Sequence, residues 1–264
     1  MHKLLREVRF CVNPFLANST NGGNSYCCRP GGDGLAVYFA LWIELLAGVD
    51  KDTGFVVNVV DIDKAVRRYV VPVFDGKVKE SFKQSQHVSL TDLYDLLGQG
   101  WAALKDKFEN ASLISVGLNV MPHRRITINS EDLKLITISE KFEFAATHKL
   151  WNESFSDQKN FEVFGKCANP NGHGHNYIVE ITVAIDDKEK FSSYGFEGTV
   201  DKEFISIVDH KNLNADVEEF ARVNPTVENI TTFAWGCLKG KFSNATLHSI
   251  TIWESDRMCC TFSG

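Results

Sequence analysis

The chain has 264 residues, a formal net charge of −6 and a pI near 5.8, with 44% hydrophobic and 23% charged residues. This composition is that of a folded globular protein and excludes an intrinsically disordered chain. The negative charge, with no basic stripe carrying interleaved aromatic residues, argues against a nucleic-acid partner.

The sequence has no signal-peptide pattern and no run of 18 apolar residues, so we expect no membrane partner. The seven cysteines include the adjacent pairs Cys27-Cys28 and Cys259-Cys260, and no Cys-x-x-Cys motif occurs. This usage does not indicate a disulfide framework. We therefore expect the protein to reside in a reducing cytoplasm.

The N-terminal half predicts strands and helices in alternation. The expected elements are strands at 7–12, 35–49, 113–120 and 125–128 and helices at 61–69 and through 101–104. The stretch 35–49 is the longest apolar one and is broken by Glu44, which is typical of a buried strand. A polar connector at 129–132 follows the last strand and predicts a domain boundary, with domains at 1–132 and 133–264.

The C-terminal half repeats this plan. Strands are expected at 142–148, 175–185, 247–253 and 258–262. A helix at 202–209 carries an apolar stripe of Phe204, Ile207 and Val208, and a second helix begins near Asn224-Pro225, where Asn caps and Pro fits the first turn. The order β-β-α-α-β-β predicts an α+β fold, a four-stranded antiparallel sheet with two helices on one face.

An internal repeat supports two copies of one unit. The segment 101–113 matches 235–247 without a gap, from Trp101 and Trp235 through Leu113 and Leu247, at an offset of 235 − 101 = 134 residues. Such self-similarity indicates that the chain is a tandem of two related units.

The chemistry concentrates in the second unit. The segment 165–177, Gly-Lys-Cys-Ala-Asn-Pro-Asn-Gly-His-Gly-His-Asn-Tyr, places Cys167 on a Pro/Gly-rich loop and then His173 and His175 on one face of a strand. His148 ends the strand before it. A lone strand histidine is more often structural than a ligand, but three histidines match the number of protein ligands of a catalytic zinc. A zinc hydrolase is disfavoured because no His-Glu-x-x-His motif occurs.

Several separated motifs together resemble 6-pyruvoyl-tetrahydropterin synthase. They are Phe-Ala-Ala-Thr-His at 144–148, the segment 163–177, Val-Asp-His-Lys-Asn-Leu-Asn at 208–214, Pro-Thr-Val-Glu-Asn at 225–229 and Trp-Glu-Ser at 253–255. They follow the family's order across the C-terminal half. The resemblance implies a tunnelling fold, whose units join into a barrel, and therefore a homo-oligomer.

The resemblance also implies the reaction and its residues. The family converts 7,8-dihydroneopterin triphosphate to 6-pyruvoyl-tetrahydropterin and releases triphosphate. Zn2+ would be held by His148, His173 and His175, and Cys167 would act as the proton-transfer base, as a thiolate if a cation or histidine lowers its pKa. The implied proton relay and pterin contacts are Asp209 with His210, and Glu254, Thr226 and Glu228.

Each role has a structural alternative. Cys167 can be a small buried hydrophobe, Asp209-His210 can close a helix, Glu254 can be a turn residue and Glu228 can serve the first turn of its helix. Three functions also stay open: this lyase, a related pterin enzyme such as 6-carboxy-tetrahydropterin synthase or a side-chain-cleaving relative, and a non-catalytic module that binds a pterin or purine.

The first unit lacks this chemistry. Aligning Asp50 with Asp186 puts Val37 and Phe39 opposite His173 and His175, and the 134-residue offset puts Val120 opposite Glu254. Asp75-Gly76 stands where the second unit has Asp209-His210. We therefore expect residues 1–132 to be a degenerate synthase-like unit without metal ligands and residues 133–264 to be the catalytic unit.

Overall fold

The computed structural model describes residues 1–15, 36–131 and 135–264. Within them the chain forms two compact units, Met1–Ile138 and Ser139–Gly264. The expected boundary between residues 132 and 133 falls outside the described residues, as do Leu35 and the Cys27-Cys28 pair. In the described part of the chain, no helix is both long and apolar enough to cross a membrane.

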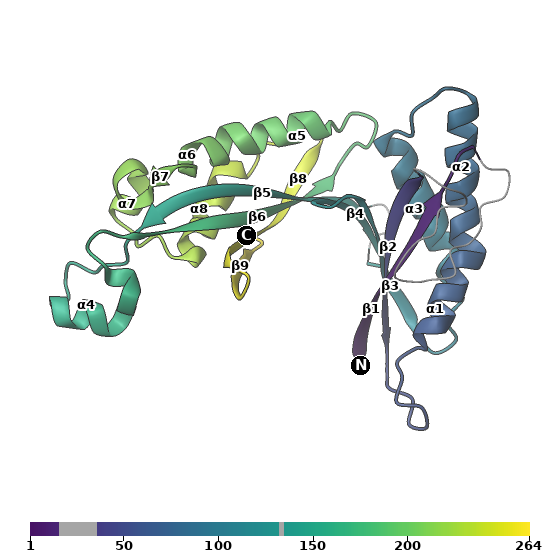
Figure 1. Cartoon of the computed structure of the whole chain (residues 1–264), viewed down its shortest axis with the longest axis horizontal. Helices are drawn as coiled ribbons and strands as arrows, with labels where there is room; N and C mark the ends of the chain where they lie inside the picture. The colour runs from purple at the N-terminus through teal and green to yellow at the C-terminus, as the bar shows by residue number, and fades with distance from the viewer. Residues whose placement is uncertain (16–35, 132–134) are drawn as a thin grey trace. The chain divides into compact units, whose positions relative to one another are not determined.

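The N-terminal unit places helices against one face of a sheet whose strands follow the order β1-β2-β3-β4, with antiparallel neighbours (Figure 1). Its strands are β1 (His2–Val12), β2 (Val37–Ala47), β3 (Ser112–Met121) and β4 (Arg124–Asn129). Its helices are α1 (Val59–Ala65), a π-helical turn (Val66–Val70), α2 (Val71–Lys83) and α3 (Leu90–Leu104).

The two helices that the sequence predicts for this unit are both longer in the structure. The helix expected at 61–69 continues through α2 to Lys83, and the helix expected at 101–104 begins at Leu90. Pro72 does not end the first helix; it lies in the first turn of α2, directly after the π-helical turn, and its fixed φ fits a helix.

Helix α3 begins with a reciprocal cap. The Ser89 hydroxyl accepts a hydrogen bond from the Asp92 backbone N–H, and the Asp92 carboxylate accepts from the Ser89 backbone N–H. The Lys77 ammonium lies 2.6 Å from the same carboxylate. Lys77 first, and then this cap, lower the pKa of Asp92 to about 2.

Replacing Asp92 by Asn is therefore expected to lower the free energy of unfolding by up to about 1 kcal/mol, because Asn keeps an acceptor for the Ser89 N–H but loses the charge that pairs with the partly exposed Lys77. Because the folded pKa lies below that of the unfolded chain, the contribution is complete above about pH 4 and is lost as the pH falls toward 2. Urea unfolding of the wild type and of Asp92→Asn between pH 2 and about pH 5 measures both the loss of stability and its dependence on pH. The control is Asp106→Asn, a charge loss at an exposed turn.

The C-terminal unit has strand order β5-β6-β8-β9, with the short β7 parallel to β5 (Figure 1). Its strands are β5 (Ile136–His148), β6 (His173–Ile185), β7 (Lys211–Asn212), β8 (Ala245–Ser255) and β9 (Met258–Phe262). Its helices are α4 (Asp157–Phe164), a 3-10 helix (Gly165–Ala168), α5 (Ser193–Val200), a π-helical turn (Asp201–Ile205), α6 (Ser206–Val208), α7 (Leu213–Asp216), a 3-10 helix (Glu218–Ala221) and α8 (Val227–Leu238).

The α+β class is confirmed, and the described strands form an open sheet. The helix expected at 202–209 starts earlier, at Ser193, capped by the Ser192 hydroxyl. Its buried face repeats every four residues, with Phe204 and Val208 fully buried. Ile207 is 38% exposed, so its assignment to the apolar stripe was wrong.

The start of α8 also differs from the prediction. Thr226, not Asn224, is the N-cap, because its hydroxyl accepts from the Asn229 backbone N–H. The Asn224 side chain instead accepts from the Trp151 backbone N–H, at 2.8 Å. Asn224 and Pro225 thus lie in the turn before α8 and connect it to the chain that follows β5.

The five cysteines among the described residues are free: Cys11, Cys167, Cys237, Cys259 and Cys260. The placement of the protein in a reducing compartment stays a prediction.

Candidate metal centre and active site

The histidine cluster forms where β5 ends and β6 begins. His148 is the last residue of β5, and His173 and His175 are the first and third residues of the neighbouring β6. Alternation along β6 keeps the two on one face. One nitrogen from each of the three rings lies within 4.8 Å of the others, and the His148 and His173 Nε2 atoms are 3.0 Å apart.

A close backbone contact holds these strand ends together. Gly172, directly before β6, has φ +70°, and a Cβ there would lie 2.9 Å from the carbonyl oxygen of His148. Only glycine combines this left-handed conformation with such an approach. The Gly-His-Gly-His sequence therefore brings β6 to the end of β5.

His148 is oriented from a distant part of the chain. Its side chain is buried, and its Nδ1 donates a hydrogen bond of 2.6 Å to the carbonyl oxygen of Pro225. With Nδ1 protonated in this way, Nε2 carries the lone pair and points toward His173. Metal-binding histidines are commonly fixed by this type of second contact. Pro225 is a residue whose role the sequence did not indicate, because it acts through its backbone.

The remaining rings fit a metal. His173 Nδ1 and His175 Nε2 are buried and have no hydrogen-bond partner among the described residues. Burial lowers the pKa of both His148 and His173, which favours the neutral imidazole. Neutral imidazole is the form that binds metal. Three imidazole donors around one point are thus suited to a divalent ion with an open coordination position.

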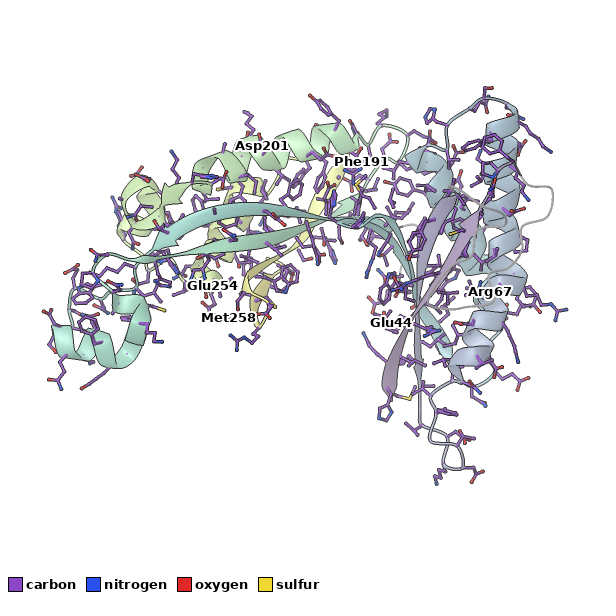
Figure 2. All side chains as sticks on the ribbon, viewed as in Figure 1. Glu44, Arg67, Phe191, Asp201, Glu254 and Met258 are labelled. Atoms are coloured by element: carbon purple, nitrogen blue, oxygen red, sulfur yellow. The ribbon has the colours of Figure 1, made fainter. Side chains whose placement is uncertain are left out.

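Glu254 faces this cluster. Its Oε1 lies 3.5 Å from His148 Nε2 and 3.6 Å from His175 Nε2. The residue lies near the end of β8, before the turn to β9, which begins at Met258 (Figure 2). The register with β9 shifts between Trp253 and Ser255, so Glu254 occupies a β-bulge. Bulges redirect side chains.

Tyr177 completes the inner wall of the site. Its hydroxyl donates to Glu254 Oε1 at 3.4 Å, and its ring stacks on Phe144 with centroids 4.7 Å apart. Burial, followed by the charge of Glu254, raises the pKa of Tyr177, so the phenol stays protonated. Sequence reasoning did not select Tyr177, although it lies two residues beyond His175 and therefore on the same face of the strand.

Cys167 lies in the 3-10 helix Gly165–Ala168 and not in the irregular loop that was predicted. Its backbone carbonyl accepts from the Leu150 N–H at 2.9 Å, which connects this helix to the chain after β5. The thiol is half-buried. Burial first, and then the nearby charge of Glu254, raise its pKa. The chain's own groups therefore favour the thiol over the thiolate.

Asp209 and His210 pair with each other away from the cluster. His210 Nδ1 lies 2.8 Å from an Asp209 carboxylate oxygen, and the other oxygen accepts from the Ala145 N–H, which lowers the pKa of Asp209. Ala145 lies three residues before His148, about 10 Å along the strand. The His210 side chain is 83% exposed. Among the described residues, neither Asp209 nor His210 forms a hydrogen bond or ion pair with Cys167.

The two candidate pterin contacts on α8 have clear local roles. Thr226 caps the helix, and Glu228 is an exposed acid in its first turn, where it interacts favourably with the helix dipole. Their contact with a ligand stays a prediction.

Comparison with known proteins supports the sequence resemblance. Residues 137–264 match the family model described as 6-pyruvoyl tetrahydropterin synthase. The human 6-pyruvoyl tetrahydrobiopterin synthase is 34% identical over 131 residues, which cover 48% of this chain and 90% of that protein. A putative 6-pyruvoyl tetrahydrobiopterin synthase from Caenorhabditis elegans is 34% identical over 137 residues, 50% of this chain and 97% of that protein.

A solved structure, that of Caenorhabditis elegans 6-pyruvoyl tetrahydropterin synthase, is 33% identical and covers 49% of this chain and 96% of its own, with a TM-score of 0.46. The residues that match the family model, 137–264, contain the histidine cluster. The chain thus belongs to the 6-pyruvoyl tetrahydropterin synthase family.

Proposed function

We propose that the protein is a zinc-dependent phosphorus-oxygen lyase that converts 7,8-dihydroneopterin triphosphate to 6-pyruvoyl-tetrahydropterin and releases triphosphate. The observation that carries the proposal is the cluster of His148, His173 and His175 facing the Glu254 carboxylate, within the region that matches the family. The curated relatives named above are synthases of the same product class by name.

The histidine nitrogens would hold Zn2+, and Pro225 would fix the tautomer of His148. When bound there, zinc supplies a Lewis acid that stabilises charge developing on the oxygens of the substrate side chain. Protons on carbon next to a hydroxyl are otherwise too weakly acidic for a side chain to remove.

Cys167 would take such a carbon-bound proton on its Sγ atom. Its raised pKa means that this step needs a positive charge or a protonated histidine near the sulfur. The exposed His210, held by Asp209, is the candidate histidine for this role, but it lies away from the cluster of its own unit. We propose that it reaches Cys167 of a neighbouring copy in a barrel-like homo-oligomer.

Glu254 would accept hydrogen bonds from the ring N–H and amino groups of the pterin, and Tyr177 would orient its carboxylate. Replacing Glu254 by Gln keeps the shape but removes the charge. We expect KM to rise roughly ten- to hundredfold, the range for a hydrogen bond to a charged group, with a smaller change in kcat. Steady-state kinetics measure this, and an unchanged KM contradicts the assignment.

The two units would have different roles. We propose that residues 133–264 are the catalytic unit and residues 1–132 a degenerate copy of it. Each unit has a π-helical turn within its first long helix, Val66–Val70 and Asp201–Ile205. Each also has a β-bulge near the end of its third long strand, at Val120 in β3 and at Glu254 in β8. The described N-terminal residues contain no comparable cluster of metal-binding side chains.

The decisive experiment incubates the zinc-loaded protein with 7,8-dihydroneopterin triphosphate and follows triphosphate and pterin products by mass spectrometry. Formation of 6-pyruvoyl-tetrahydropterin supports the lyase. Formation of a carboxy-pterin or of a side-chain-cleaved pterin would indicate a related pterin enzyme instead. Tight pterin binding without turnover would make it a binding module.

A further inference from the structure

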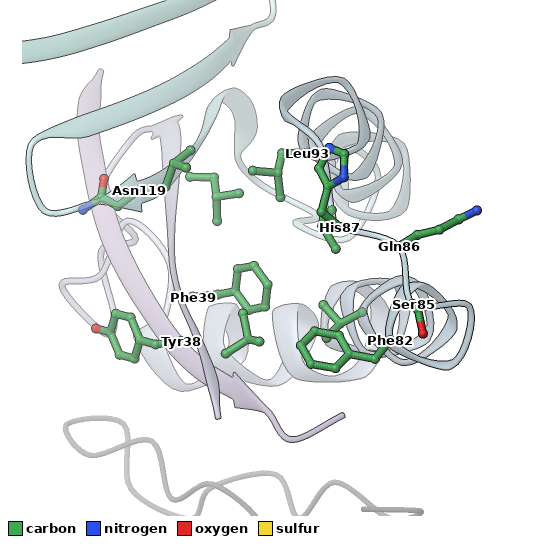
Figure 3. A pocket seen from close by; sticks show the side chains of 13 residues that line it. Tyr38, Phe39, Phe82, Ser85, Gln86, His87, Leu93 and Asn119 are labelled. Carbon is green, nitrogen blue, oxygen red and sulfur yellow. The ribbon is translucent and has the colours of Figure 1, made fainter. Parts of the chain in front are cut away.

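The N-terminal unit contains a pocket of about 670 Å³ between its sheet and the facing ends of α2 and α3 (Figure 3). This volume is within the usual range for small-molecule sites. The described residues that line it include no Asp, Glu, Lys or Arg. Most of its lining is aliphatic or aromatic, including Val37, Phe39, Val78, Leu93, Leu118 and Val120, and its neutral polar lining residues are Tyr38, Ser85, Gln86, His87 and Asn119.

Aromatic rings face this space from two elements. Figure 3 shows the ring of Phe39, from β2, and the ring of Phe82, from α2, both directed into the pocket. Tyr38 and Asn119 also belong to the strand segments that line the pocket, but their side chains point away from it, to the opposite side of the strands (Figure 3). Phe82 is 45% exposed, and its ring contacts that of Phe15 edge to face with centroids 5.8 Å apart. The pocket therefore presents the partly exposed ring of Phe82 to an occupant, whereas the Phe39 ring is 6% exposed and already stacks on Phe10 with centroids 5.2 Å apart.

The pocket lies at the position that corresponds to the metal centre of the other unit. Val37 and Phe39 begin β2, as His173 and His175 begin β6. Val120 occupies a β-bulge at the end of β3, as Glu254 does at the end of β8, and the 134-residue offset pairs these two residues. The three positions that provide polar groups in one unit thus provide apolar side chains in the other.

We infer that this pocket is a second ligand site, specific for an uncharged, planar aromatic molecule and not for a pterin. A pterin needs partners for its ring N–H and amino groups, and burying those groups without partners is costly. Val120 offers none where Glu254 offers a carboxylate, and the other polar side chains of the lining, among them Ser85, Gln86 and His87, provide no carboxylate to replace it. An apolar ring loses no hydrogen bonds there and stacks against Phe82.

The test uses the neutral naphthalene fluorophore prodan and the intact chain. Saturable binding with a blue-shifted emission is expected for the wild type. Val120→Glu places a carboxylate in the pocket and is expected to weaken binding at least tenfold, because a buried charge without a partner is unfavourable. Asn119→Asp is the matched control, since it adds the same charge one residue away on the opposite face, and it should bind as the wild type does.

Phe82→Ala provides a second variant that removes a partly exposed ring, and about fivefold weaker binding is expected. Thermal melts followed by circular dichroism verify that each variant is folded. Neopterin should not displace the probe. Absence of saturable binding to the wild type, equal binding by wild type and Val120→Glu, or displacement by neopterin overturns the inference. None of these outcomes depends on the catalytic activity of the C-terminal unit.

Discussion

Replacing His175 by Ala is expected to abolish product formation and to weaken zinc binding. Loss of a hydrogen bond to a metal-binding side chain typically lowers metal affinity about ten- to hundredfold, and we expect loss of a ligand to lower it further. His175 provides one of only three clustered imidazoles, and two remaining ligands cannot maintain a tetrahedral site with one open position. Its side chain is 25% exposed, so its loss should disturb packing less than loss of the buried His148.

Zinc content after dialysis, measured by plasma emission spectrometry, and turnover of 7,8-dihydroneopterin triphosphate are the two readouts. The matched control is His248→Ala, which removes an exposed histidine from β8 of the same unit and should leave both unchanged. Chelation of the wild type should abolish turnover, and added zinc should restore it. A His175→Ala protein that retains one zinc per chain would show that the three histidines are not the ligands.

Replacing Cys167 by Ala is expected to reduce kcat by about 10²- to 10⁴-fold, the usual contribution of a positioned base, with zinc content unchanged. Cys167→Ser should be similarly impaired, because a hydroxyl is a far poorer proton acceptor than a thiolate at neutral pH. The half-buried thiol lies near Glu254 and Tyr177, both of which interact with it electrostatically.

Single-turnover assays with mass spectrometric detection separate the chemical step from product release. Cys259→Ala is the control because it removes an exposed thiol from β9 of the same unit. Full activity in Cys167→Ala would exclude the sulfur as the base and would favour the reading of Cys167 as a small hydrophobe.

Mixing inactive variants tests the proposed role of neighbouring copies. If His210 acts on Cys167 of another chain, a mixture of Cys167→Ala and His210→Ala proteins should recover part of the activity that each lacks alone. Recovery requires subunit exchange, which size-exclusion chromatography with light scattering can follow. If activity does not recover although the subunits have exchanged, His210 does not act on Cys167 of another chain.

The long strands of the C-terminal half could be predicted well because their signals are local. The alternation of His173, His175 and the residues after them is a property of neighbouring positions, and it indicates a strand with both histidines on one face. The 134-residue repeat is likewise visible without coordinates. These features identified the histidine cluster, the α+β class and the family region.

Helix boundaries were less accurate because several local signals compete. The sequence Asn224-Pro225-Thr226 contains two possible caps, and the choice of Thr226 depends on where the Asn224 side chain finds its partner. That partner, the Trp151 backbone, lies 73 residues earlier. Similarly, only the packed structure shows that the helix expected at 61–69 continues past Pro72.

What the sequence by itself determined was therefore the identity of the clustered histidines and the strands that bear them, since both follow from spacing along the chain. Tertiary structure alone decided their environment. The contact of His148 with Pro225 joins residues 77 positions apart, the β-bulge turns Glu254 toward the histidines, and burial raises the pKa of Cys167. Hydrogen bonding and desolvation depend on groups that are distant in sequence, so only the folded chain brings them together.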